Sequence, residues 1–319
     1  MRDVSVGWAE GGGGTLQSAA RSRGRRHWEN ATRSQRIGYG VGAVLVTSGL
    51  VHLGIHLASG TPWAGAVSWR KPTTFGLSFG ATLLTVTFLR TFLSRVPRLV
   101  DATLVALAVA CAGEVAGATL QRWRGVPSHF NEATPFDATV WTAMGALIGV
   151  VGLCILVFTI VSLVGTEGSS SLRLAVRLAF FALLAGQVTG AAIVQNADTM
   201  SPDERFERAA VVEPAGDLKL VHAATLHAAQ LFPAFALVAA TVDWSERRRF
   251  RTLVVVGVGY AVVCGVLAAQ AGGGLAVTDL GTESAVVLLA GVVLVGASVL
   301  SLAGAVAGGQ RRSANRQRE

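Results

Sequence analysis

The amino-acid sequence predicts an all-α, polytopic membrane helix bundle with about eight transmembrane helices and both termini in the cytoplasm. Three observations predict this class: high hydropathy, long apolar runs and a biased distribution of basic residues. Of 319 residues, 51% are apolar and only 14% are charged, and the mean hydropathy is +0.52. A soluble protein of this length is much less hydrophobic. The lipid bilayer is therefore the first expected partner of this chain.

The apolar residues are grouped into runs that are long enough to span a membrane. A helix needs about 20 apolar residues to cross a hydrocarbon core of about 30 Å. Because the runs are continuous rather than alternating, they favour helices over the strands of a β-barrel. We predict eight spans, at residues 37–58, 73–93, 99–120, 138–164, 172–194, 218–242, 252–272 and 283–308.

The basic residues predict the orientation of these spans. If the amino terminus is cytoplasmic, 20 of the 27 Lys and Arg residues fall on the inner side, which is a strong positive-inside bias. The basic charge then reflects topology and attraction to anionic lipids, and no nucleic-acid partner is expected. We predict a multi-pass protein of the plasma (inner) membrane. Seven basic residues fall on the outer side: Arg70, Lys71, Arg122, Arg124, Arg205, Arg208 and Lys219.

The two ends of the chain differ from its centre. Residues 1–36 contain "GGGG" and "RSRGRR" and show no apolar periodicity, so we predict a disordered, basic cytoplasmic tail. Residues 37–308 form the predicted bundle, and residues 309–319 form a second basic cytoplasmic tail. The three cysteines lie inside apolar runs, where a thiol behaves as a small apolar group, and no structural disulfide is expected.

Polar residues within the spans gather on the predicted outer side. Ionisable groups inside a membrane are costly and usually face the bundle interior or a water-filled cavity. We therefore predict an outward-facing polar pocket. Five of the six histidines fall on this side: His52, His56, His129, His222 and His227.

Helical spacing indicates which of these side chains can share the pocket. His52 and His56 are four residues apart and lie on one face, separated by about 40°. Glu114 and Gln121 are seven apart and differ by about 20°. Glu114 interrupts the apolar run "ALAVACAGEVAGATL", so its carboxyl group must be protonated, paired or hydrated. A functional role for Glu114 is favoured over a structural one.

The later histidines show a different spacing. His222 and His227 are five residues apart and are separated by about 140°, so both cannot point at one small ligand. We expect one of them to bond a neighbouring helix. Gln230 follows His227 at i+3 and makes a local pair with it, and Pro233 introduces a kink near the site.

The loop "RGVPSHFNEATPFD", residues 124–137, is rich in groups that bond, turn or titrate. Its two prolines interrupt helix, while Ser128, Asn131 and Thr134 are good capping residues. We expect a shaped connector that folds over the pocket and inserts His129.

Two short motifs place cations on the predicted outer side, "WRKP" at 69–72 and "QRWRG" at 121–125. Two interpretations are equally favoured. The cations snorkel to lipid phosphates, or they bind an anion.

Several of these motifs resemble a widespread family of uncharacterised bacterial multi-pass membrane proteins. The resemblance rests on "QRWRGVPSHFNEATPFD" at 121–137 with Glu114 seven residues before it, on "DLKLVHAATLHAAQLFP" at 217–233 and on "WRKPTTFGLSFG" at 69–80. It covers roughly residues 37–242. The resemblance implies a multi-pass membrane protein and implies no particular activity.

The leading functional hypothesis is a redox membrane protein that binds haem b or a divalent metal. Neutral imidazoles on facing helices can ligate a metal or haem iron, and outer cations can pair with haem propionates. A quinone or an extracytoplasmic redox partner would exchange the electrons. The residues assigned to the cofactor are His52, His56, His222, His227, Gln230 and Arg124, and those assigned to catalysis are Glu114, His129 and Asn131.

Two alternatives remain open. In a proton-coupled transporter or channel, Glu114 and the histidines would titrate along a pathway, although the inner half of the bundle shows few ionisable groups. In a membrane-embedded hydrolase, Ser128 or a metal-bound water would be the nucleophile, although no nucleophile motif is present.

Overall fold

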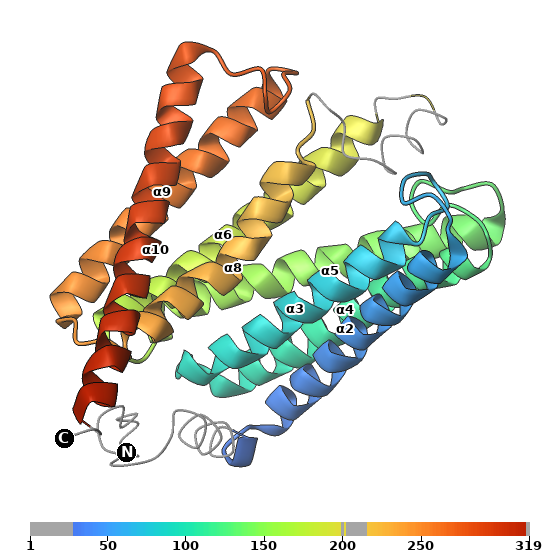
Figure 1. The fold of residues 1–319 in the computed structure, drawn as a ribbon. Helices are drawn as coiled ribbons and strands as arrows, with labels where there is room; N and C mark the ends of the chain where they lie inside the picture. Colours follow the sequence, from blue (N-terminus) through green and yellow to red (C-terminus); the bar gives the residue numbers. More distant parts are fainter. Residues whose placement is uncertain (1–27, 199–200, 202–215, 317–319) are drawn as a thin grey trace.

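The computed structural model describes residues 28–198, 201 and 216–316, which form a bundle of long helices (Figure 1). Eight of these helices are long and apolar enough to cross a membrane, which confirms the predicted all-α multi-pass bundle. They are α2 (Arg33–Ser59), α3 (Arg70–Leu89), α4 (Pro97–Trp123), α5 (Pro135–Gly165), α6 (Ser170–Asp198), α8 (Lys219–Ala239), α9 (Glu246–Gly272) and α10 (Thr282–Arg316), and a 3-10 turn, η1 (Arg90–Phe92), follows α3.

The first helix begins earlier than its apolar run predicts. Thr32 caps α2: its hydroxyl accepts a hydrogen bond from the Gln35 backbone amide at 3.2 Å, and the Gln35 side chain accepts one from the Thr32 amide at 3.1 Å. This capping box satisfies two amides that a helix start leaves without partners. Residues 33–36 are therefore helical rather than part of a disordered tail, and residues 1–27 lie outside the described part of the chain.

The helices form two groups. In the first, α2 packs along α3, both pack against α4, and α4 packs against α5. In the second, α6 packs against α8, and α9 contacts α6, α8 and α10. The groups meet where α5 packs on α6 and where α3 contacts α8 (Figure 1).

Helix α2 starts and helix α10 finishes at the same end of the bundle, as eight spans require (Figure 1). We name this end the inner end and the opposite one the outer end, because the basic residues predict that the former faces the cytoplasm. The orientation itself stays a prediction.

Glycines allow α2 and α3 to approach each other at backbone distance. A Cβ atom on Gly49 would lie 2.8 Å from the amide nitrogen of Leu77 and 2.9 Å from the carbonyl oxygen of Thr73. A Cβ atom on Gly76 would lie 2.7 Å from the Cα atom of Gly49. Small residues at such contacts promote helix association in membranes, where no hydrophobic effect drives it. Helices α2 and α3 therefore form a closely packed pair within the first helix group.

Large apolar side chains are exposed on the faces of the helices that point away from the bundle interior. On α10 they include Val286, Leu289, Val293 and Leu300. Exposed apolar groups over the whole length of a helix are typical of contact with lipid acyl chains rather than with water. The lipid bilayer is therefore the environment that this surface requires.

Cysteine accessibility in intact cells tests the orientation. In a chain whose three native cysteines are replaced by alanine, Ala133→Cys should react with a membrane-impermeant maleimide added outside. Ser245→Cys should react only after lysis, because this exposed residue precedes α9 at the inner end. Labelling of Ser245→Cys in intact cells would reverse the orientation.

Candidate functional site

Glu114 lies on the buried face of α4, within the first helix group. It is 2% exposed, and its neighbours along this face, Cys111, Val115 and Ala118, are buried as well. Its Oε2 atom is enclosed without a partner, and no residue in the described part of the chain forms a hydrogen bond with the carboxyl group. The packing around Oε2 offers no partner to an ionised carboxylate, which would need water or a cation there.

Gln121 and Arg124 join the outer end of α4 to α5. Gln121 is fully buried, and its amide donates to Asp137 Oδ1 at 2.9 Å. The Arg124 guanidinium donates to Asp137 and to Gln121. Thr134 caps α5, as predicted, and its hydroxyl donates to Asp137 Oδ2 at 2.6 Å. Arg124, predicted to bind a cofactor, therefore neutralises a buried carboxylate of the protein itself.

The loop that follows α4 inserts His129 between α3 and α5. The imidazole ring lies 5.3 Å from the ring of Phe75 and 5.4 Å from the ring of Trp141, between centroids. Its Nδ1 atom is 3.0 Å from the hydroxyl of Ser128. The structure thus agrees with the expectation that this connector is shaped and places His129 against the helices.

Ser128 and Asn131 are both used to shape this loop. The Asn131 side chain donates to the backbone carbonyl four residues before it at 3.0 Å and accepts from the amide two residues after it at 3.1 Å. The hydroxyl of Ser128 is hydrogen-bonded to the ring of His129, and the residue is only 3% exposed. A catalytic nucleophile must be reached by its substrate, so this geometry gives the hydrolase alternative little support.

His52 uses both ring nitrogens within the protein. Its Nδ1 atom lies 2.7 Å from the carbonyl oxygen of Ser48, and its Nε2 atom accepts a hydrogen bond from the Trp123 indole at 3.1 Å. Trp69 stacks on the imidazole, with 5.7 Å between centroids, and the guanidinium of Arg122 lies 3.9 Å from the Trp69 centroid. The histidine therefore belongs to an aromatic and cationic stack that holds the outer ends of the helices together.

The structure separates the two histidines of α8, as helical spacing predicts. His222 Nδ1 lies 2.8 Å from the carbonyl oxygen of Gly186 on α6, so His222 is the one that bonds a neighbouring helix. His227 is exposed on the surface of the bundle. The side-chain amide of Gln230 is 3.2 Å from Thr85 Oγ1 and links α8 to α3 rather than pairing with the His227 ring.

The four histidines assigned to a cofactor do not converge in this conformation. His52 is bonded at both nitrogens, His56 lies 4.8 Å from the ring of Trp63, His222 is bonded to α6 and His227 is exposed. Within the described residues, no three His, Cys, Asp or Glu side chains are grouped as metal ligands. The bonded nitrogens of His52 and His222 are therefore not available to a metal or haem iron in this conformation, whereas the buried Nδ1 atom of His56 has no hydrogen-bond partner among the described residues. Cofactor binding and a quinone or redox partner stay predictions, which a visible spectrum and metal analysis would test.

A group of cationic side chains lies where α3, α8 and the 124–134 loop meet. Lys71 is 8% exposed, and Arg70 and Lys219 lie within electrostatic range of it. Asp217 pairs with Lys219 at 2.9 Å. Burial, together with the charge of Lys71, holds the pKa of His129 well below its ordinary value of 6.5, so this imidazole is neutral at pH 7. Most of Lys71 is buried, which is compatible with either interpretation of its charge, snorkelling to lipid phosphates or binding of an anion.

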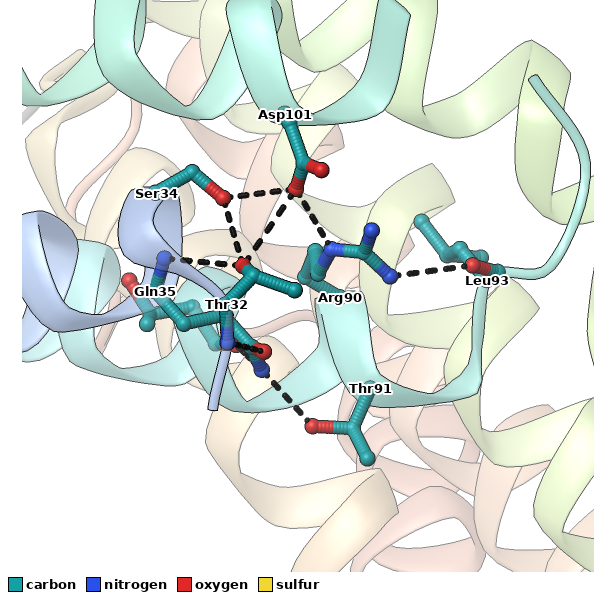
Figure 2. A network of polar contacts seen from close by, with 8 residues as sticks. Thr32, Ser34, Gln35, Arg90, Thr91, Leu93 and Asp101 are labelled. Atoms are coloured by element: carbon teal, nitrogen blue, oxygen red, sulfur yellow. Dashed lines mark hydrogen bonds and ion pairs between the residues drawn. The ribbon is translucent and has the colours of Figure 1, made fainter. Parts of the chain in front are cut away.

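A second polar network closes the inner end of α2, α3 and α4 (Figure 2). Arg90 Nε donates to Asp101 Oδ1 at 2.8 Å, and the hydroxyl of Ser34 donates to the same oxygen at 2.6 Å. Gln35 Nε2 donates to Thr91 Oγ1 at 2.9 Å. Sequence reasoning missed this network, although an acidic residue within the basic inner segment was a signal that could have revealed it.

Two cavities of the structure are lined by residues other than those predicted for the pocket. One of about 10 Å³ lies between α8 and α9. The other, about 270 Å³, is open to the surface and is lined by Ser170, Glu246, Arg247 and Phe250. Neither is lined by Glu114 or by a histidine.

Comparison of the chain with protein-family models, curated proteins and solved structures found no match. The resemblance to a bacterial multi-pass family stays a prediction, and function has to be inferred from the residues themselves.

Proposed function

We propose that the protein is a proton-coupled membrane transporter in which Glu114 carries the proton. The observation behind this proposal is a buried carboxyl group that has no hydrogen-bond partner among the described residues. Such a group holds its proton while it is enclosed and releases it when water or a cation reaches it. Proton binding then favours one conformation over the other, which is what coupling requires.

Polar groups at both ends of the same helices support a route across the membrane. The Gln121–Asp137–Arg124 network lies at the outer end of α4, and the ion pair shown in Figure 2 lies at its inner end. Between them Leu83, Leu104 and Leu107 are completely buried, so apolar side chains separate the two networks in this conformation. This separation favours alternating access by helix movement over a continuously open channel.

The other two functional classes have less support from the geometry. The redox hypothesis needs free imidazole nitrogens that face one another, and those of His52 are already bonded within the protein. The hydrolase hypothesis needs an accessible nucleophile, and Ser128 is buried. The transporter hypothesis needs a titratable group in the bundle interior, which Glu114 supplies, and a helix movement that brings water to it.

Proton uptake into liposomes tests the role of Glu114. The protein is reconstituted with a pH-sensitive dye trapped inside, and a potassium gradient with valinomycin makes the interior negative. We expect wild-type liposomes to take up protons, and Glu114→Gln liposomes to lose at least about 90% of this uptake, because the amide cannot exchange a proton. Glu132→Gln is the matched control, since Glu132 is exposed in the 124–134 loop and should retain wild-type uptake.

Two results would contradict the proposal. Wild-type liposomes could take up protons no faster than empty liposomes, or Glu114→Gln could transport as the wild type does. A size-exclusion profile and a melting temperature for each variant separate a lost proton carrier from a lost fold.

A further inference from the structure

We infer that one exposed side of α9 binds an anionic phospholipid, whose phosphate group contacts Arg247 and Arg251 and whose acyl chains lie along Val254 and Val258. The site is at the inner end of the bundle, separate from Glu114, and it does not rest on the proposed transport function. The inference begins with two arginines that have no partner among the described residues.

Arg247 and Arg251 lie in the first two turns of α9, and both are exposed. Neither forms a hydrogen bond, an ion pair or a ring contact with any residue that the structure describes. The neighbouring arginines differ: the Arg248 guanidinium lies 4.2 Å from the centroid of the Trp244 ring, and Arg249 donates to a backbone carbonyl oxygen at 3.1 Å. The charges of the first pair are therefore available to a ligand.

Helical geometry places both arginines on one side of α9. Glu246 accepts a hydrogen bond from a backbone amide of α6 at 2.6 Å, and a Cβ atom on Gly257 would lie 3.2 Å from a side chain of α6. A Cβ atom on Gly259 would lie 2.9 Å from a backbone oxygen of α10. At about 100° per residue, Arg247 and Arg251 point about 100° and 140° away from the α6 contact, and α10 lies about 220° away. Both arginines therefore point between α6 and α10, away from the bundle interior.

The same side of α9 continues as an exposed apolar stripe. Phe250, Val254 and Val258 lie at about 40°, 80° and 120° from the α6 contact, and all three are exposed. Exposed apolar side chains along a spanning helix are typical of contact with acyl chains. The arginines precede this stripe, at the level where acyl chains give way to headgroups. A phospholipid on this side can cover the valines and present its phosphate group to the arginines.

A cavity where α6 and α9 meet has room for part of a headgroup. It has a volume of about 270 Å³, is open to the surface and is lined by Ser170, Glu246, Arg247 and Phe250. The Ser170 hydroxyl accepts a hydrogen bond from Arg173 at 3.2 Å and keeps its own proton for a phosphate oxygen. Glu246 is the acidic residue of this lining, and one of its oxygens is held by the α6 backbone. The cavity therefore adds a hydroxyl donor next to Arg247.

The local charge favours an anionic headgroup over a zwitterionic one. Residues 243–251 include four arginines and two acidic residues, Asp243 and Glu246. A guanidinium binds phosphate through two parallel hydrogen bonds, and basic clusters next to a spanning helix attract anionic lipids. A zwitterionic lipid brings its own cation to the same arginines, which offsets part of this attraction.

Thermal unfolding in mixed micelles measures the lipid preference. The full-length protein is purified in an uncharged detergent, and phosphatidylglycerol or phosphatidylcholine with the same acyl chains is added in rising mole fraction at constant ionic strength. We expect phosphatidylglycerol to raise the melting temperature with a saturable dependence and phosphatidylcholine to raise it less, because a ligand that binds only the folded state stabilises it. Inorganic phosphate at the same concentration should not reproduce this shift, because it has no acyl chains to cover the apolar stripe.

Two double variants locate the lipid. Arg247→Gln with Arg251→Gln should raise the mole fraction of phosphatidylglycerol needed for half of the stabilisation by about tenfold or more, since charged hydrogen bonds to phosphate are lost. The matched control is Arg36→Gln with Arg98→Gln, which removes the same charge from exposed positions of α2 and α4 at the inner end and should respond as the wild type does. In phosphatidylcholine alone the two double variants and the wild type should have similar melting temperatures, which shows that each is folded.

A response to phosphatidylglycerol that the Arg247 and Arg251 variant loses and the control variant retains supports the inference. Four results overturn it. The two lipids could stabilise the wild type equally, or the Arg247 and Arg251 variant could respond as the wild type does. An equal loss in the control variant would indicate non-specific attraction to charge, and equal stabilisation by inorganic phosphate would indicate a soluble ligand.

Discussion

Gly76→Val is expected to separate α2 from α3 and to reduce the yield of folded protein to a small fraction of the wild type. A Cβ atom at this position would lie 2.7 Å from both the Cα and the amide nitrogen of Gly49, and 2.8 Å from the carbonyl oxygen of Leu45. All three are backbone atoms, so no side-chain rotation relieves the overlap. Overpacking usually costs about 1–3 kcal/mol, and an overlap that the backbone cannot relieve should exceed this range.

Gly54→Val is the matched control for this prediction. It introduces the same β-branched side chain into α2, but a Cβ atom at Gly54 would meet nothing within 4 Å. Size-exclusion chromatography and thermal unfolding in detergent measure both variants. If Gly76→Val gave a monodisperse protein with the melting temperature of Gly54→Val, α2 and α3 could not be packed in this register.

The eight spans could be predicted because membrane crossing leaves a long signal in the sequence. Each helix needs about 20 apolar residues, and the structure has a helix at every run that meets this length. The helix ends were harder to predict, since the residues that set them are polar. Thr32 and Gln35 start α2 with a capping box, and both lie outside the hydropathy signal. α10 likewise continues to Arg316, beyond the last apolar residue of its run.

Within the candidate site, local geometry was predicted and long-range partners were not. The spacing of His222 and His227 correctly implied that they diverge, because the helical period fixes it. The bond from Trp123 to His52 joins residues 71 positions apart, and periodicity gives no information about such a contact. The electrostatic effects of Lys219 on Lys71 and of Lys71 on His129 likewise join residues that are distant in sequence. The sequence shows which residues carry a charge, but tertiary packing decides whether each charged side chain has a partner.

Asp101→Leu is expected to destabilise the inner end of the bundle by about 2–3 kcal/mol. Asp101 accepts hydrogen bonds from Arg90 and Ser34, which joins the ends of α2, α3 and α4 (Figure 2). Without it, the Arg90 guanidinium, whose side chain is 11% exposed, retains one bond, to the carbonyl oxygen of Leu93 at 3.3 Å. Stranding a fully buried charge costs about 3–5 kcal/mol, and the partial exposure of Asp101 reduces this figure.

A double-mutant cycle isolates the ion pair from the rest of the network. Arg90→Met combined with Asp101→Leu should recover most of the lost stability, because apolar residues often replace a buried ion pair without penalty. Reversible unfolding in mixed detergent micelles measures the free energy of unfolding of each variant. Arg98→Met is the control, because it removes one positive charge from an exposed position of α4. Recovery in the double variant would mean that Asp101 matters chiefly as the partner of Arg90. If the double variant were instead as unstable as the sum of the two single variants, the hydrogen bond from Ser34 rather than the ion pair would hold the inner end closed.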